Sequence, residues 1–373
     1  MFFSGSASAS DKTSQYCRIK YTLVIIETGY LVVLLFLFTG LGFSAVLVKH
    51  LSGLVRASLL LLPVYIIVVY LAYYLLDFPL NFYQSFVLEH RFGLSNQKIK
   101  DWLKDQVKSS VILYLIALIL AGVFYYTLKH FLHSWWLVFS LFWIFLSLIL
   151  AKLTPVVIIP LFFKYKKLED KQLRNRIVKL SEKMGVGILD VFEIDLSKKT
   201  LKGNAAFAGW GRTKRVILAD TLKDKYDYDE IEVILAHEFA HYRLGHLLKL
   251  ILFNSFFAVV SFYILFIAGD RALGLFGFNS LWEIAALPVV LIYLVLLGLI
   301  MQPLQNYLSR RFERAADKEA LRVTGLREAF ISTLEKLAAQ NLADRNPSAL
   351  IKFLFFSHPP IDERIALARK YHI

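Results

Sequence analysis

Six long stretches of this chain are almost entirely apolar, and they set its organisation. They cover residues 21–48, 59–76, 111–128, 135–163, 248–268 and 284–304. A helix needs about 20 apolar residues to cross the hydrocarbon core of a bilayer. Buried helices of soluble proteins do not use stretches this long and this nearly free of charge. The pattern therefore predicts a mainly α-helical, polytopic membrane protein with six spanning helices.

The segment 164–247 follows a different pattern, in which polar and apolar residues alternate. Residues 168–184 have the period of an amphipathic helix, and residues 191–195 and 215–219 read as strands. Residues 203–209, between the two strands, are small and are predicted to be extended. An edge strand of this kind can pair with an extended substrate backbone. We therefore expect a small α+β module that contains a substrate-pairing segment.

These patterns divide the chain into four regions. They are an N-terminal membrane region of about four spanning helices (1–163), the α+β module (164–247), two further spanning helices (248–304) and a C-terminal helical segment (305–373). Pro155 and Pro160 predict a kink where the fourth stretch ends. Residues 77–110 interleave aromatic and charged side chains, which favours an interfacial connection.

Composition and charge support a membrane protein. Hydrophobic residues make up 57% of the chain and charged ones 19%, and the mean hydropathy is +0.55, well above that of a soluble protein. The net charge of +14 does not indicate nucleic acid, because no binding signature accompanies the basic residues. Their distribution over alternate loops follows the positive-inside rule and predicts that segment 164–247 faces the cytoplasm. The single cysteine, Cys17, allows no intramolecular disulfide.

The most informative short motif is His237-Glu238-Phe239-Ala240-His241. Its two histidines lie about 40° apart around a helix axis, so both rings point to one side and can reach one Zn²⁺. Glu238 projects beside them, where it can hold and deprotonate a water at the metal. We expect Asp229 to cap this helix, with Glu232 completing a capping box. The motif predicts one catalytic zinc ion per chain.

A catalytic zinc usually takes a third protein ligand and leaves one position open. His246 lies about 140° around the helix from His241, so we expect it to point elsewhere. Glu313 and Asp317 are better candidates, because they share one face of a helix that follows the sixth apolar stretch. We predict that Glu313 ligates the zinc and that Asp317 orients a zinc histidine or assists proton transfer. A solvated, charged helix face is the alternative for these two acids.

In these segments the chain resembles the type I CAAX prenyl proteases, which are integral-membrane zinc endopeptidases. The resemblance rests on the zinc motif and its extension (237–246), the segment 309–317 and five further matches in the same order along the chain. Those matches are residues 86–93, 159–163, 204–209, 215–222 and 358–364. The long acidic insertion that precedes the zinc helix of eukaryotic members is absent, so the chain is most similar to prokaryotic members.

The resemblance implies a helical barrel around a water-filled chamber, with the zinc site facing inward at one end. It implies that the zinc ligands are His237, His241 and Glu313 and that the base is Glu238. It also places Asn204 and Ala205 on the substrate-pairing segment, His358 and Arg364 near the substrate and the oxyanion, and Asp317 as the acid that follows the third ligand.

The predicted activity is peptide-bond hydrolysis. Glu238 would deprotonate the attacking water and pass the proton to the leaving amine, while His358 or Arg364 helps to hold the oxyanion. We expect a prenylated or otherwise membrane-associated peptide or protein as substrate, and no nucleic acid. The membrane would be the plasma membrane of a prokaryote or the endoplasmic reticulum of a eukaryote.

Two rival functions fit part of the sequence. A quality-control protease that degrades misassembled membrane proteins would use the same chemistry on other substrates. A transporter or channel is suggested by Glu27 and Lys152, which lie within apolar stretches. The transporter leaves the zinc motif unexplained, so we favour the protease.

Overall fold

The computed structural model describes residues 9–209 and 214–371. Its helices are α1 (Ala9–Gly40), α2 (Phe43–Leu54), α3 (Ser58–Phe82), α4 (Leu88–Arg91), α5 (Ile99–His130), α6 (Trp135–Leu153), α7 (Ile159–Phe162), α8 (Lys171–Lys183), α9 (Asp220–Lys223), α10 (Tyr228–Arg243), α11 (His246–Gly274), α12 (Leu287–Thr324), α13 (Arg327–Asn341), α14 (Ala349–Phe355) and α15 (Ile361–Lys370). Its strands are β1 (Tyr165–Lys167), β2 (Asp190–Ile194), β3 (Ala205–Ala208) and β4 (Arg215–Ala219).

Six helical segments within the described residues are long and apolar enough to cross a membrane, which confirms the predicted number. They are Asp11–Gly40, Ser58–Arg91, Ile99–His130, Trp135–Phe162, His246–Gly274 and Ile284–Thr324. The first differs from the predicted helix over 21–48, because α1 ends at Gly40 and α2 begins at Phe43. Gly42 between them has φ 76°, a left-handed conformation that glycine adopts without steric cost. A continuous apolar stretch in the sequence can therefore contain a turn between two helices.

The segment at residues 77–110, predicted to be an interfacial connection, is mostly helical, and its interfacial position stays a prediction. The second span continues through Arg91 and α5 begins at Ile99, which leaves a short connection. The aromatic residues pack on one another: the rings of Phe82 and Phe86 stack with centroids 5.3 Å apart. A π-helical turn, Thr154–Ile158, separates α6 from α7 and contains Pro155. Such turns are a common cause of helix kinks, and the kink predicted from Pro155 and Pro160 stays a prediction.

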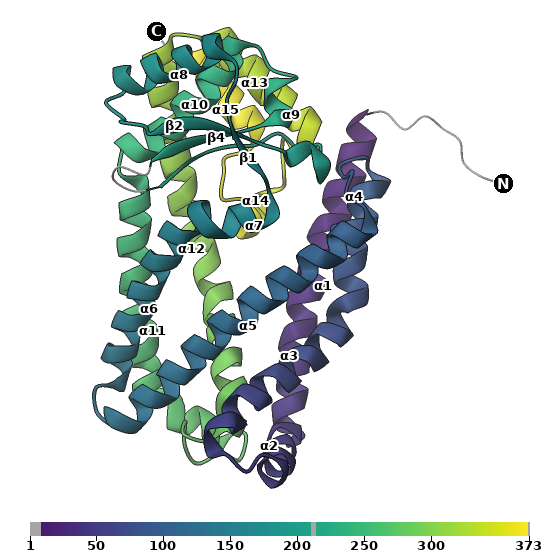
Figure 1. Ribbon diagram of the computed structural model, residues 1–373, viewed down its shortest axis with the longest axis vertical. Coiled ribbons are helices and arrows are strands. Elements are labelled where there is room, and N and C mark those ends of the chain that lie inside the picture. Colours follow the sequence, from purple (N-terminus) through teal and green to yellow (C-terminus); the bar gives the residue numbers. More distant parts are fainter. Residues whose placement is uncertain (1–8, 210–213, 372–373) are drawn as a thin grey trace, which may run out of the picture.

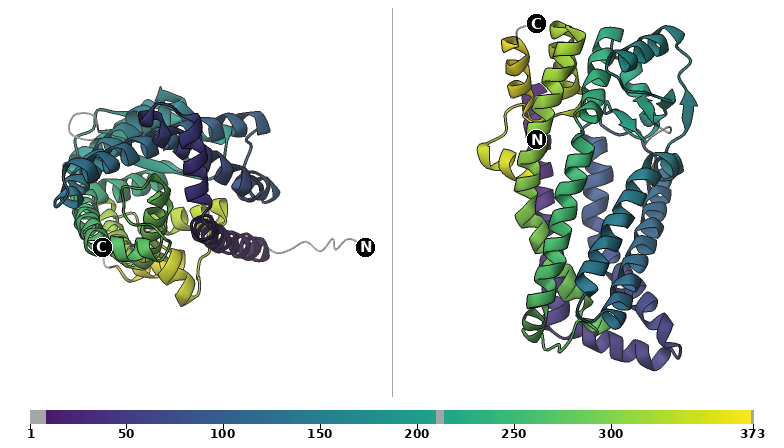
Figure 2. Two further views of the ribbon diagram at one scale, coloured as in Figure 1. Left: turned by 90° about the horizontal axis from the view of Figure 1, so that it is seen from below. Right: turned by 90° about the vertical axis from the view of Figure 1, so that its left-hand side faces the viewer.

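The spanning helices form a closed ring. In chain order α1, α3, α5, α6, α11 and α12 each contact the next, and α12 contacts α1 again. Seen from below, they follow one another around the molecule from purple α1 to green α12 (Figure 2). This arrangement confirms the predicted helical barrel. The sheet and most of the shorter helices lie at one end of it (Figure 1).

The small sheet has the strand order β1-β2-β4-β3. The predicted strands at 191–195 and 215–219 are confirmed as β2 and β4, which pair in parallel. β3 is an edge strand that pairs antiparallel with β4, with Ala205 opposite Leu218 and Phe207 opposite Val216. The small, extended segment is therefore placed at the free edge of the sheet, as the sequence predicts.

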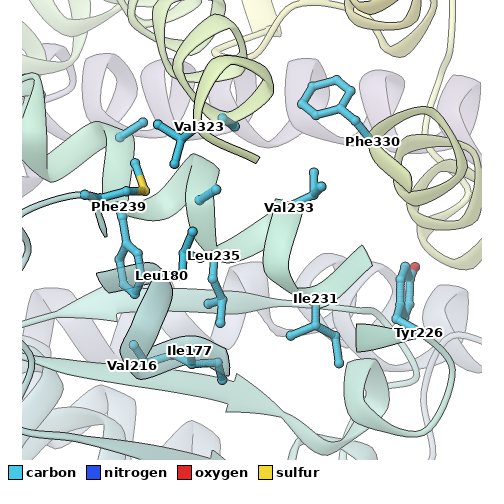
Figure 3. Packing of buried hydrophobic residues seen from close by; sticks show 14 of the residues in the cluster. Ile177, Leu180, Val216, Tyr226, Ile231, Val233, Leu235, Phe239, Val323 and Phe330 are labelled. Carbon is cyan, nitrogen blue, oxygen red and sulfur yellow. The ribbon is translucent and has the colours of Figure 1, made fainter. Parts of the chain in front are cut away.

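One face of α10 packs on this sheet, and that packing positions the histidine motif. Ile231, Leu235 and Phe239 are at most 1% exposed and belong to a single core with Val216 of β4 and Ile177 of α8 (Figure 3). Full burial of one such side chain contributes roughly 1.5–3 kcal/mol. The two motif histidines come from the opposite side of the same helix, so the buried face fixes the direction in which they point.

Candidate metal centre and active site

The capping box of α10 lies two residues before the predicted one. Asp227 accepts a hydrogen bond from the Glu230 N–H at 2.9 Å, and the Glu230 carboxylate accepts one from the Asp227 N–H at 3.0 Å. Asp229 and Glu232 instead both bind Arg176 of α8. The two acidic pairs have the same spacing, so spacing alone could not distinguish them.

The three predicted zinc ligands converge at one point between α10 and α12. The Nε2 atoms of His237 and His241 lie 3.1 Å apart. Glu313 Oε2 lies 3.1 Å from His237 Nε2, and Glu313 Oε1 lies 3.3 Å from His241 Nε2. Within the described part of the chain, this is the one group of three or more such side chains close enough to hold a metal ion.

The separations fit a tetrahedral zinc site. Ligand atoms at about 2.0–2.1 Å from Zn²⁺ lie roughly 3.3 Å from one another in tetrahedral geometry. Glu313 is 4% exposed, and its Oε2 forms no hydrogen bond of ordinary geometry with the described residues. A buried carboxylate oxygen without such a partner is costly unless a cation satisfies it. The donor set therefore fits zinc.

Asp317 and Arg364 form a chain of contacts behind the first histidine. Asp317 is fully buried, and its Oδ1 lies 2.9 Å from His237 Nδ1. Arg364 of α15 donates from Nε and Nη2 to the two Asp317 oxygens at 2.9 and 2.6 Å. This ion pair raises the pKa of the Arg364 guanidinium against the opposing effect of its burial. Asp317 is thus held rigidly at the outer nitrogen of His237.

His358 and Glu238 lie on the open side of the centre. The side chain of His358 is 61% exposed, and its Nδ1 is 2.9 Å from Glu313 Oε2. Glu238 lines a cavity of about 170 Å³ together with His237, His358 and Arg364. The structure therefore brings the predicted base and both predicted oxyanion residues to the wall of one cavity.

The predicted substrate-pairing residues line the same cavity. Asn204 and Ala205, at the start of β3, form part of its wall. The opposite wall comes from α13, whose contribution includes Leu334, Leu337 and Thr333. The Thr333 hydroxyl is buried and has no hydrogen-bond partner among the described residues. The sequence does not reveal this wall, because α13 joins the site only through its packing in three dimensions.

His246 is not part of the candidate ligand group, as the sequence predicts, but it lies closer to His241 than the predicted angle suggests. Its Nδ1 lies 3.1 Å from His241 Nδ1, and its ring stacks on Phe312 with centroids 4.4 Å apart. The expected angle of about 140° assumes one continuous helix. Instead α10 ends before Gly245, which has φ 65°, and His246 starts α11 in a new direction. A glycine just after a helical pattern commonly marks the end of the helix, so Gly245 indicates in the sequence that the helix stops before His246.

Known proteins resemble nearly the whole chain. The model of peptidase family M48 matches residues 167–372, and the model described as CAAX prenyl protease N-terminal, five membrane helices, matches residues 5–164. The uncharacterized metalloprotease YhfN of Bacillus subtilis is 31% identical over 95% of this chain and 84% of its own length. CAAX prenyl protease 1 of Saccharomyces cerevisiae is 30% identical over 78% of this chain and 68% of its own. The crystal structure of S. mikatae Ste24p has a TM-score of 0.88 at 25% identity and covers 97% of this chain and 89% of that one.

Proposed function

The chain belongs to peptidase family M48 and is a membrane metalloendopeptidase, and on this premise we propose that His237, His241 and Glu313 hold one catalytic zinc ion, with Glu238 as the general base. The observation that carries the proposal is the convergence of the three ligand atoms beside a cavity that Glu238 lines. Two histidines and one carboxylate leave a fourth position for water or substrate.

In this mechanism Glu238 accepts a proton from the attacking water and later delivers it to the leaving amine. A zinc ion bound by the three side chains would polarise the peptide carbonyl and promote ionisation of the water. His358 lies at the exposed rim of the cavity, where its ring can donate a hydrogen bond to the developing oxyanion. Arg364 lines the same cavity, but its bidentate bond to Asp317 assigns it mainly to positioning.

Asp317 is assigned to the orientation of His237. A carboxylate beside Nδ1 favours the tautomer that carries its proton there, which leaves the lone pair of Nε2 for the metal. The 2.9 Å separation between Asp317 Oδ1 and His237 Nδ1 supports this assignment. β3 is assigned to the substrate backbone, since it is the edge strand and its residues Asn204 and Ala205 lie at the cavity.

We further propose that the substrate is a membrane-associated or lipidated peptide, which reaches the site from the cytoplasmic side. The basic side chains Lys98, Lys100 and Lys104 are exposed at the start of α5, in agreement with the positive-inside rule. The segment just before α5 contacts the α+β module, because the Asn96 N–H donates to the Lys199 carbonyl at 3.2 Å. A relative named CAAX prenyl protease 1 supports a lipidated substrate. The membrane is the plasma membrane in a prokaryote and the endoplasmic reticulum in a eukaryote.

The experiment compares one peptide with and without a farnesyl group on the purified full-length protein. Each buried methylene contributes about 0.8 kcal/mol, so burial of two already accounts for about a tenfold gain in affinity. We expect the farnesylated peptide to have a KM at least about tenfold lower. Both peptides are measured in one detergent below their aggregation concentrations, and Glu238→Ala protein should release no product from either. Equal kinetic constants would favour the quality-control protease.

A further inference from the structure

The free edge of β3 presents only some of its backbone groups to a substrate. The Ala219 N–H donates to the Asn204 carbonyl at 3.2 Å, so these two residues form a hydrogen-bonded pair of the antiparallel ladder. Such pairs alternate along the ladder with pairs that exchange no hydrogen bonds. In this register Gly203, Ala205 and Phe207 therefore direct their N–H and C=O groups away from β4, toward the free edge.

One of these three positions is already taken. Asn341, the last residue of α13, accepts a hydrogen bond from the Gly203 N–H at 3.0 Å and donates one to the Gly203 carbonyl at 3.5 Å. A primary amide offers the same acceptor and donor as a peptide group. The Asn341 side chain thus occupies the place that a residue of an added strand would occupy opposite Gly203.

The contact is held firmly by its surroundings. A Cβ atom on Gly203 would lie 2.8 Å from both Gln340 Oε1 and Leu222 Cδ2, so a larger residue here would require these side chains to move. Gln340 donates to the Leu201 carbonyl at 2.7 Å and accepts a hydrogen bond from the Tyr226 hydroxyl at 2.8 Å. Gln340, the neighbour of Asn341, therefore fastens the end of α13 to the segment that precedes β3.

The other two positions, Ala205 and Phe207, differ from Gly203, and Ala205 lies at the candidate active site. Among the described residues, no side chain forms a hydrogen bond with the backbone of Ala205 or Phe207. Ala205, Asn341 and Glu238 all line the cavity of about 170 Å³. Since a strand rises about 3.3 Å per residue, Asn341 blocks backbone pairing about 7 Å beyond Ala205. In the opposite direction β3 extends to Ala208.

We propose that Asn341 is a positioning residue that ends the substrate strand. It limits how many residues a peptide can extend from the scissile bond toward Gly203, whereas no side chain among the described residues occupies the backbone positions at Ala205 and Phe207. This inference rests on the proposed function, because it requires a substrate that pairs with β3 beside Glu238.

The test uses the full-length protein and two series of peptides that share one core. One series is lengthened residue by residue before the scissile bond, and the other after it. For the wild-type protein we expect kcat/KM to fall by at least about tenfold, or about 1.4 kcal/mol, once one series passes a limiting length, while the other series shows no such limit. In Asn341→Ala the ratio of kcat/KM for long and short peptides of the limited series should rise about tenfold. Asn341→Asp keeps an acceptor for the Gly203 N–H and should keep the limit.

The possible outcomes distinguish a failure of this inference from a failure of the proposed function on which it rests. A merely structural role for Asn341 predicts an equal loss for long and short peptides, with the same length profile as the wild type, and that result would contradict the inference. A wild-type protein without a length limit in either series would also contradict it. Failure of the wild type to cleave any peptide, or equal cleavage by Glu238→Ala, would overturn the proposed function itself. Asn341→Ser takes the place of the alanine variant if that variant purifies without zinc.

Discussion

At the scale of single residues, His237 carries the densest set of interactions in the site. Its Nε2 faces Glu313, while its Nδ1 faces Asp317, which is itself bound by Arg364. Burial by itself lowers the pKa of His237, but the adjacent carboxylates of Asp317 and Glu313 outweigh it and raise the pKa to about 9. The surroundings of this ring therefore favour a positive charge, which agrees with a site built for a metal cation.

Asp317→Ala should weaken zinc binding without removing a ligand. The substitution leaves His237 Nδ1 without its carboxylate and leaves the Arg364 charge unpaired in a buried position. Loss of such a supporting group typically costs 10- to 100-fold in metal affinity or activity, and we expect about that loss in both. Zinc titration and kcat/KM measure it. Lys318→Ala, an exposed neighbour on the same helix, is the matched control. Values within about twofold of wild type for Asp317→Ala would refute the positioning role.

At the scale of elements, the proposed pairing of β3 with the substrate can be tested by removing a single backbone N–H. Ala205 directs its N–H to the free edge, whereas Ala206, opposite Ile217, directs its N–H into the sheet. Proline removes the N–H and is tolerated best at a sheet edge. We therefore expect Ala205→Pro to raise the KM for a peptide about tenfold, equivalent to about 1.4 kcal/mol, with zinc retained.

Ala206→Pro serves as the contrasting variant. It removes a ladder hydrogen bond to β4 and should lower the unfolding temperature, an effect that Ala205→Pro should largely lack. An unchanged KM in Ala205→Pro would mean that the substrate backbone does not pair with β3 at this residue.

Sequence patterns predicted the elements that depend on local order and missed the contacts between them. The alternation at 215–219 and the spacing of His237 and His241 are local features, and both predictions agree with the structure. The angle of His246 failed because helical geometry ends at Gly245. No sequence pattern marks Asn341 as a functional residue, since its proposed role depends on where the end of α13 packs.

At the scale of the whole molecule, the site joins parts of the chain that are far apart in sequence. α10 and β3 belong to the extramembrane module, whereas Glu313 and Asp317 lie on α12, which continues from the sixth span. α12 runs without a break through the boundary at residues 304 and 305, so the division into four regions stays a prediction. Because the proposed third ligand, Glu313, is on a spanning helix, the position of the barrel and the geometry of the candidate metal centre are directly linked.

The central claim is that three side chains hold the zinc and a fourth performs the proton transfer. The most direct measurement is the zinc content of purified Glu238→Ala and Glu313→Ala proteins, together with their peptidase activity. We predict that Glu238→Ala retains about one zinc ion per chain and loses turnover, because the base is not a ligand. Glu313→Ala should lose both, since two histidines alone do not complete a catalytic site. A Glu313→Ala protein with full zinc and full activity, or an active Glu238→Ala protein, would contradict the account.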